Sequence, residues 1–118
     1  MKTSSCKAKG RRACAELKTQ IINSFPELGV DDIVVTPSGV KGEDLTLSPF
    51  ARSMVPFSFE VKNQERLSIW DAIKQAKKRG GQYPFAVAFT RNHSDINVVI
   101  SLNSFLFLLR RLRDRRAT

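Results

Sequence analysis

The chain has 118 residues, which suits a single domain over 1–118 with a modest core and basic ends. A net charge of +9 favours a polyanionic partner such as nucleic acid. The sequence excludes a zinc-finger or disulfide framework, because it has one histidine and two cysteines, Cys6 and Cys14, which we expect to stay reduced in the cytoplasm. It also lacks an apolar run that would suit a signal peptide or a membrane span, so no membrane contact is expected.

The first half of the chain predicts one helix and three strands. Residues 8–24 place apolar side chains at three- and four-residue spacing, which predicts a helix that ends before Pro26. Residues 32–36 and 44–48 read as short strands. Residues 56–62 alternate strictly between apolar and polar, which predicts a half-buried strand.

The second half predicts a helix, two strands and a last helix. Ser68 is a suitable N-cap for the first of these helices, Trp70 is expected in the core, and Gly80 is expected to end the helix. Residues 83–90 are apolar on both faces, which favours a central strand, and residues 96–102 suggest another. Asn103 can cap a final helix whose apolar side chains are Phe105, Leu106, Leu108, Leu109 and Leu112. The order predicts an α/β fold, a mixed β-sheet flanked by helices.

Three of the polar side chains on these strands suit phosphodiester chemistry. Asp44 lies on the polar side of its strand, and Glu60 and Lys62 lie on the polar side of the next. If residues 49–55 form a hairpin with an irregular turn, the three side chains converge. Two carboxylates are hard oxygen ligands for Mg²⁺, and an ammonium group beside them neutralises charge on a phosphate. On spacing alone, these residues are equally compatible with an ordinary solvated sheet face.

Further candidates lie on the helices and in the basic clusters. Glu16 is a possible additional acid, and Gln75 is a possible contact to phosphate or water; each is otherwise a solvated helix residue. The cationic candidates for substrate binding are Arg11, Arg12, Arg52, Lys77, Lys78 and Arg91. The sequence has a single histidine, His93, and it lies in a predicted turn. A serine or cysteine catalytic triad is therefore not expected, because that one histidine would have to serve it.

Segments 42–52 (GEDLTLSPFAR) and 56–65 (PFSFEVKNQE) resemble phage-encoded nucleases of the PD-(D/E)xK superfamily, of the Holliday-junction-resolvase-like kind. The likeness covers most of the chain after residue 10, with Gly-Glu-Asp standing where the superfamily name has Pro-Asp. The resemblance implies a restriction-endonuclease-like αβββαβ core. It also implies a metal held by Asp44 and Glu60, a catalytic Lys62, and a helix-borne glutamate, here Glu16.

The expected function is therefore a metal-dependent DNA endonuclease acting on branched DNA. Asp44, Glu60 and the Val61 carbonyl are expected to hold Mg²⁺, for which Mn²⁺ would substitute, while Glu16 binds directly or through water. Because a junction is cut on two strands, a homodimer is expected. Two alternatives stay open: a sequence-specific homing or nicking endonuclease on the same core, and a catalytically inactive DNA-binding protein.

Overall fold

The computed structural model describes the backbone of residues 2–37 and 39–117 and the side chains of 8–37 and 39–116. Its elements run in the order α1 (Lys2–Ser24), η1 (Val30–Asp32), β1 (Ile33–Val35), β2 (Leu45–Leu47), α2 (Pro49–Met54), β3 (Ser58–Asn63), α3 (Ile69–Arg79), β4 (Phe85–Thr90), β5 (Asn97–Val99) and α4 (Leu102–Ala117). The predicted α/β class is confirmed, and all the predicted helices and strands are present. The short helix α2 and the turn η1 were not predicted.

The strands form two separate ladders. β3, β4 and β5 form a mixed sheet in that order, in which β3 and β4 are parallel and β5 is antiparallel to β4. The prediction that β4 is central is therefore confirmed. Parallel neighbours require a crossover connection, and α3 supplies it. β1 and β2 form a two-stranded antiparallel hairpin with Ile33 opposite Leu47.

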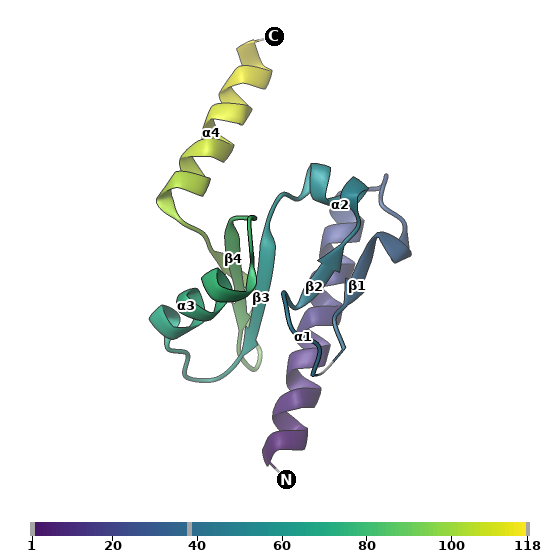
Figure 1. The fold of residues 1–118 in the computed structure, drawn as a ribbon, viewed down its shortest axis with the longest axis vertical. Coiled ribbons are helices and arrows are strands. Elements are labelled where there is room, and N and C mark those ends of the chain that lie inside the picture. The colour runs from purple at the N-terminus through teal and green to yellow at the C-terminus, as the bar shows by residue number, and fades with distance from the viewer. Residues whose placement is uncertain (1, 38, 118) are drawn as a thin grey trace.

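Both faces of the mixed sheet are covered. Figure 1 shows α1 beside the β1–β2 hairpin on one side of β3, with α3 on the other. The main core joins α1, the hairpin and alternate residues of β3 and β4, whereas Ala72, Ala76 and Val87 form a second core under α3. The prediction of a half-buried β3 is wrong, because α3 covers its polar face: Ser58 and Glu60 are each only 2% exposed.

The predicted hairpin between β2 and β3 is also wrong. Ser48 is the N-cap of α2, its Oγ accepts a hydrogen bond from the Ala51 amide at 3.0 Å, and Pro49 occupies the first helical turn. A serine at the N-cap and a proline in the first turn both favour helix initiation. The helix α2 carries the chain from the β1–β2 hairpin to the mixed sheet. One contact between the two sheets is the hydrogen bond that the Asp44 amide, next to β2, donates to the Phe59 carbonyl of β3 at 3.0 Å.

Two apolar surfaces differ from expectation. Trp70 was expected in the core but is 79% exposed, because α3 buries the stripe of Ala72 and Ala76 and Trp70 lies off that stripe. The large apolar side chains of α4 are exposed, and the helix projects away from the body of the molecule (Figure 1). Within the ranges that the structure describes, no helix combines the length and apolarity needed to cross a membrane.

Candidate active site

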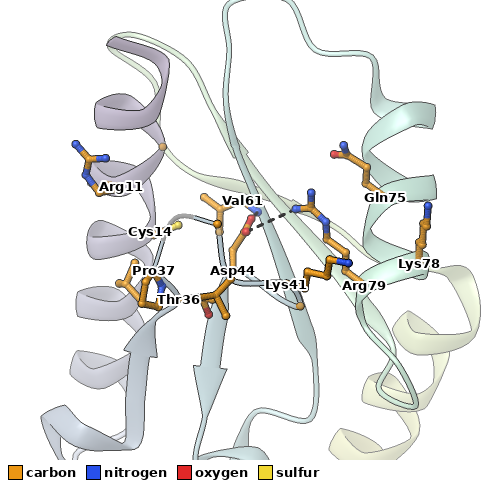
Figure 2. Close-up of a pocket in the computed structure, with 15 residues that line it drawn as sticks. Arg11, Cys14, Thr36, Pro37, Lys41, Asp44, Val61, Gln75, Lys78 and Arg79 are labelled. Carbon is orange, nitrogen blue, oxygen red and sulfur yellow. Dashed lines mark hydrogen bonds and ion pairs between the residues drawn. The ribbon is translucent and has the colours of Figure 1, made fainter. Parts of the chain in front are cut away.

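A cleft of about 790 Å³ lies where α1, the β1–β2 connection, β3 and α3 meet. Figure 2 shows its lining side chains, which come from all four segments. Among the described lining residues, Asp44 is the carboxylate, and the cations are Arg11, Lys41, Lys78 and Arg79. A cleft with this imbalance concentrates anions and suits a phosphate-bearing ligand.

Asp44 is fixed against the free edge of β3. Its amide donates to the Phe59 carbonyl at 3.0 Å, and its Oδ2 accepts from the Val61 amide at 2.7 Å. Gly42, two residues earlier, has φ 118°, a conformation that favours glycine and that brings the chain to this edge. Because the amide and carbonyl of one residue in a strand point to the same edge, the Val61 carbonyl is directed toward Asp44 and the cleft as well.

Glu60 lies below the cleft on the face of β3 that α3 covers, and it is 2% exposed. Arg79 Nη1 donates to Glu60 Oε1 at 3.0 Å, and Lys62 Nζ lies 3.8 Å from the same oxygen. Burial raises the pKa of the Glu60 carboxyl above its usual range, and the neighbouring charge of Asp44 raises it further, while Arg79 and Lys62 offset part of this rise.

Arg79 joins the two carboxylates and was not predicted from the sequence. The Nη1 that contacts Glu60 also lies 3.9 Å from Asp44 Oδ1, the contact drawn in Figure 2. Arg79 is the last residue of α3, and Gly80 behind it touches β3 so closely that a Cβ there would lie 3.0 Å from Ser58 Oγ. The close approach of helix to strand brings this guanidinium over the carboxylates.

Lys62 extends from β3 toward α3. Its Nζ donates to Gln75 Oε1 at 2.5 Å as well as contacting Glu60, and its side chain is 19% exposed. The structure thus brings Asp44, Glu60, Lys62 and Gln75 together, as the strand alternation and the helix position suggested. Their chemical roles remain predictions.

The oxygen atoms of Asp44, Glu60 and the Val61 carbonyl fit part of a Mg²⁺ ligand shell, since Mg²⁺ is bound through one or two carboxylates and retains several waters. The structure does not bring Glu16 to them. Glu16 is exposed on α1 and its Oε1 accepts from Gln20 at 3.0 Å. Within the described part of the chain, no three His, Cys, Asp or Glu side chains are grouped so as to hold a metal ion. Two carboxylates, with Arg79 between them, therefore form the candidate site.

The predicted substrate-binding residues fall into two groups. Arg11, Lys78 and Gln75 line the cleft, and Lys41 is an additional cation there that the sequence analysis missed. The remaining four lie outside its lining: Arg12, Arg52, Lys77 and Arg91.

These four residues outside the cleft lie elsewhere on the molecule, and Arg52 and Lys77 have contacts of their own. The Arg52 guanidinium pairs with Glu43, donates to the Phe57 carbonyl at 2.7 Å and stacks 4.1 Å from the Tyr83 ring centre, so it braces the fold. Lys77 lies over the Phe85 ring, and Arg91 lines a separate cavity of about 340 Å³. Arg12 is exposed on α1.

The Cys14 thiol also lines the cleft, from α1. It is free, and burial together with the charges of Asp44 and Glu60 raises its pKa to about 11. The thiol is therefore protonated at neutral pH and is a poor nucleophile or metal ligand. The side chain of Cys6 lies outside the described residues.

Comparisons with protein-family models, with curated proteins and with solved structures found no match for this chain.

Proposed function

We propose that this protein is a Mg²⁺-dependent endodeoxyribonuclease that hydrolyses phosphodiester bonds in branched DNA. One observation carries the proposal: side chains from separate places in the sequence form one charged cluster beside a cationic cleft. Lys62 contacts Glu60, and Arg79 contacts both Glu60 and Asp44, the carboxylate that lines the cleft. Two carboxylates and an ammonium group are the side chains that metal-assisted phosphate hydrolysis needs. Segments 42–52 and 56–65, which contain Asp44, Glu60 and Lys62, also resemble PD-(D/E)xK nucleases, which supports the same function.

In this proposal, Asp44, Glu60 and the Val61 carbonyl would hold the Mg²⁺, which supplies positive charge that polarises the phosphate and acidifies water. Lys62 Nζ, held between Gln75 Oε1 and Glu60 Oε1, is positioned to donate to the attacking water or to a non-bridging phosphate oxygen. Its charge opposes the negative charge that develops on the phosphate as the bond to the leaving oxygen breaks.

Arg79 is the counter-cation of the two carboxylates. Its guanidinium lies between Asp44 and Glu60, so we propose that it leaves them when Mg²⁺ enters. Because the side chain is 45% exposed, it has room to turn toward the cleft, where it would donate to a phosphate of the substrate.

The cleft cations Arg11, Lys41 and Lys78 would bind the DNA phosphates on either side of the cleaved bond. Contacts to phosphate position DNA without reading its sequence, which is compatible with recognition of shape. The order α1, β1, β2, β3, α3, β4 also supports a restriction-endonuclease-like αβββαβ core, with α2 as an insertion.

The test is cleavage of a synthetic four-way junction in Mg²⁺ and in EDTA. Asp44→Asn and Lys62→Ala are each expected to lower the rate by about 10²–10³-fold. Asp31→Asn is the matched control, because Asp31 is an exposed acid of η1 outside the cleft and should keep the wild-type rate. Full cleavage by either site variant would exclude the mechanism. Equal cleavage of linear duplex would instead favour a sequence-specific homing or nicking enzyme.

A second candidate is an inactive DNA-binding protein. Its specific support is that Arg79 already neutralises the carboxylates, and that Glu16 lies apart from them on the exposed side of α1. This alternative predicts tight binding of the junction that EDTA does not change, with no product in either Mg²⁺ or Mn²⁺.

A further inference from the structure

The helix α4 carries a continuous apolar stripe that the rest of the described chain leaves uncovered. At roughly 100° per residue, one side of the helix presents Leu102, Phe105, Leu106, Leu108, Leu109 and Leu112. These side chains are between 38% and 69% exposed, and Ser104 is the buried residue among the described side chains of α4. Figure 1 shows the helix projecting away from the body of the molecule.

We propose that this stripe is the interface with a second copy of this chain, and that two α4 helices pack antiparallel along it. At about half exposure, each large side chain offers on the order of 100 Å². Six of them remove roughly 600 Å² per protomer, or about 1,200 Å² in total, which reaches the lower limit of a standard specific interface. A patch of this size is at the upper end of what monomers expose.

The distribution of charge selects the antiparallel arrangement. The arginines of α4 occupy its C-terminal half: Arg110, Arg111, Arg113, Arg115 and Arg116. A parallel pair would bring the two arginine clusters side by side. An antiparallel pair centred near residue 107 separates them by about 18 Å along the axis, well beyond a Debye length of about 8–10 Å.

The same distribution disfavours a membrane surface as the occupant. A membrane-surface helix has one apolar face and one cationic face along its length. In α4 the apolar and cationic residues are separated along the axis, and the arginines project on all sides of the C-terminal half. Phe107 lies on the side opposite the stripe, where the Arg111 guanidinium is 5.6 Å from its ring centre.

The experiment is sedimentation velocity of the full chain without DNA or metal, so its result is independent of the proposed nuclease activity. Wild type is expected to sediment as a dimer of the 13.3 kDa chain. Leu109→Glu should raise the dissociation constant about tenfold or more. Phe107→Glu is the matched control, since Phe107 is 42% exposed and Leu109 is 45% exposed, and it should leave the dimer intact. Circular dichroism verifies that both variants fold.

Cysteine cross-linking tests the orientation. In a chain with Cys6→Ser, oxidation should cross-link Leu106→Cys near the two-fold axis and should leave Leu112→Cys monomeric. Cross-linking of both positions would overturn the antiparallel arrangement. A monomer at all concentrations would overturn the interface itself, as would equal weakening by Phe107→Glu. Monomers that bind phosphatidylglycerol vesicles, and lose that binding in Leu109→Glu, would assign the stripe to a membrane instead.

If both proposals hold, the dimer has two clefts related by a two-fold axis. A four-way junction offers two symmetric strands for cutting, so this assembly matches the proposed substrate. A Leu109→Glu variant that remains dimeric would contradict the α4 interface without bearing on the nuclease proposal. A wild-type dimer that does not cleave DNA would contradict the nuclease proposal and leave the interface standing.

Discussion

Replacement of Arg79 by Ala tests whether its guanidinium holds the place of a divalent cation. In the metal-free protein the change removes the 3.0 Å hydrogen bond to Glu60 and the 3.9 Å contact to Asp44. Hydrogen bonds to charged groups contribute about 1.5–3 kcal/mol, but Arg79 is 45% exposed, and solvent screening lowers the expected loss to about 1–2 kcal/mol. For a chain of this size, the melting temperature should fall by roughly 3–10 °C.

The contact energy that Arg79→Ala removes from the folded protein is expected to favour Mg²⁺ binding by the variant. If Mg²⁺ must displace Arg79, then the contact that wild type loses on binding is absent from the variant. Arg79→Ala should therefore bind Mg²⁺ roughly 5–30-fold more tightly, the factor that corresponds to about 1–2 kcal/mol. Its melting temperature should recover in Mg²⁺, because a ligand at 100 times its dissociation constant stabilises by about 2.7 kcal/mol.

Calorimetric titration with Mg²⁺ and thermal melting with and without the ion measure both quantities. Lys78→Ala is the control, because Lys78 lines the same cleft from the same helix and forms no ion pair with any described side chain. It should leave the metal-free melting temperature unchanged. Weaker Mg²⁺ binding by Arg79→Ala, or an unaltered melting temperature without metal, would refute the reasoning.

Three other outcomes are expected. Gly80→Ala should destabilise by about 1–3 kcal/mol in urea denaturation, because the new Cβ would lie 3.0 Å from Ser58 Oγ; wild-type stability would show that α3 can shift freely. The Ser48 hydrogen bond lowers the pKa of Asp32, so its stabilising effect is present above the ordinary value of 3.8 and is lost as pH falls through the lowered value. Asp32→Asn should make melting temperature less dependent on pH in that acid range, and an unchanged profile would contradict this assignment. Lys78→Ala should reduce the salt slope of junction binding by about one, and an equal slope would remove Lys78 from the phosphate contacts.

Most of what could be predicted about the site from the sequence came from the alternation of apolar and polar residues in the strands. The alternation in 56–62 placed Glu60 and Lys62 on one face, and the structure has them on one face. Apolar residues on both faces of 83–90 indicated a central strand, because both faces of such a strand are covered. These inferences succeeded because side-chain direction in a strand depends on local geometry alone.

Arg79 was missed because its role depends on a contact that no local pattern encodes. It follows Lys77 and Lys78 in one basic run, and the run itself does not distinguish the three. The distinction comes from the crossover of α3, which brings Gly80, and with it the C-terminal end of the helix, against Ser58 of β3. The burial of Glu60 was missed for the same reason, since it depends on which face α3 covers.

Glu60 shows how folding and the proposed chemistry oppose one another. Its pKa is raised above the unfolded value, so the fold favours the protonated acid, and the penalty for ionisation is fully present above the raised pKa. An apolar side chain at this buried position would avoid that penalty. Instead, the chain retains a carboxylate there and surrounds it with Asp44, Lys62 and Arg79. Two cations and a second acid around a buried acid are expected where a divalent ion and a phosphate are to be bound, and they are a poor way to stabilise a fold.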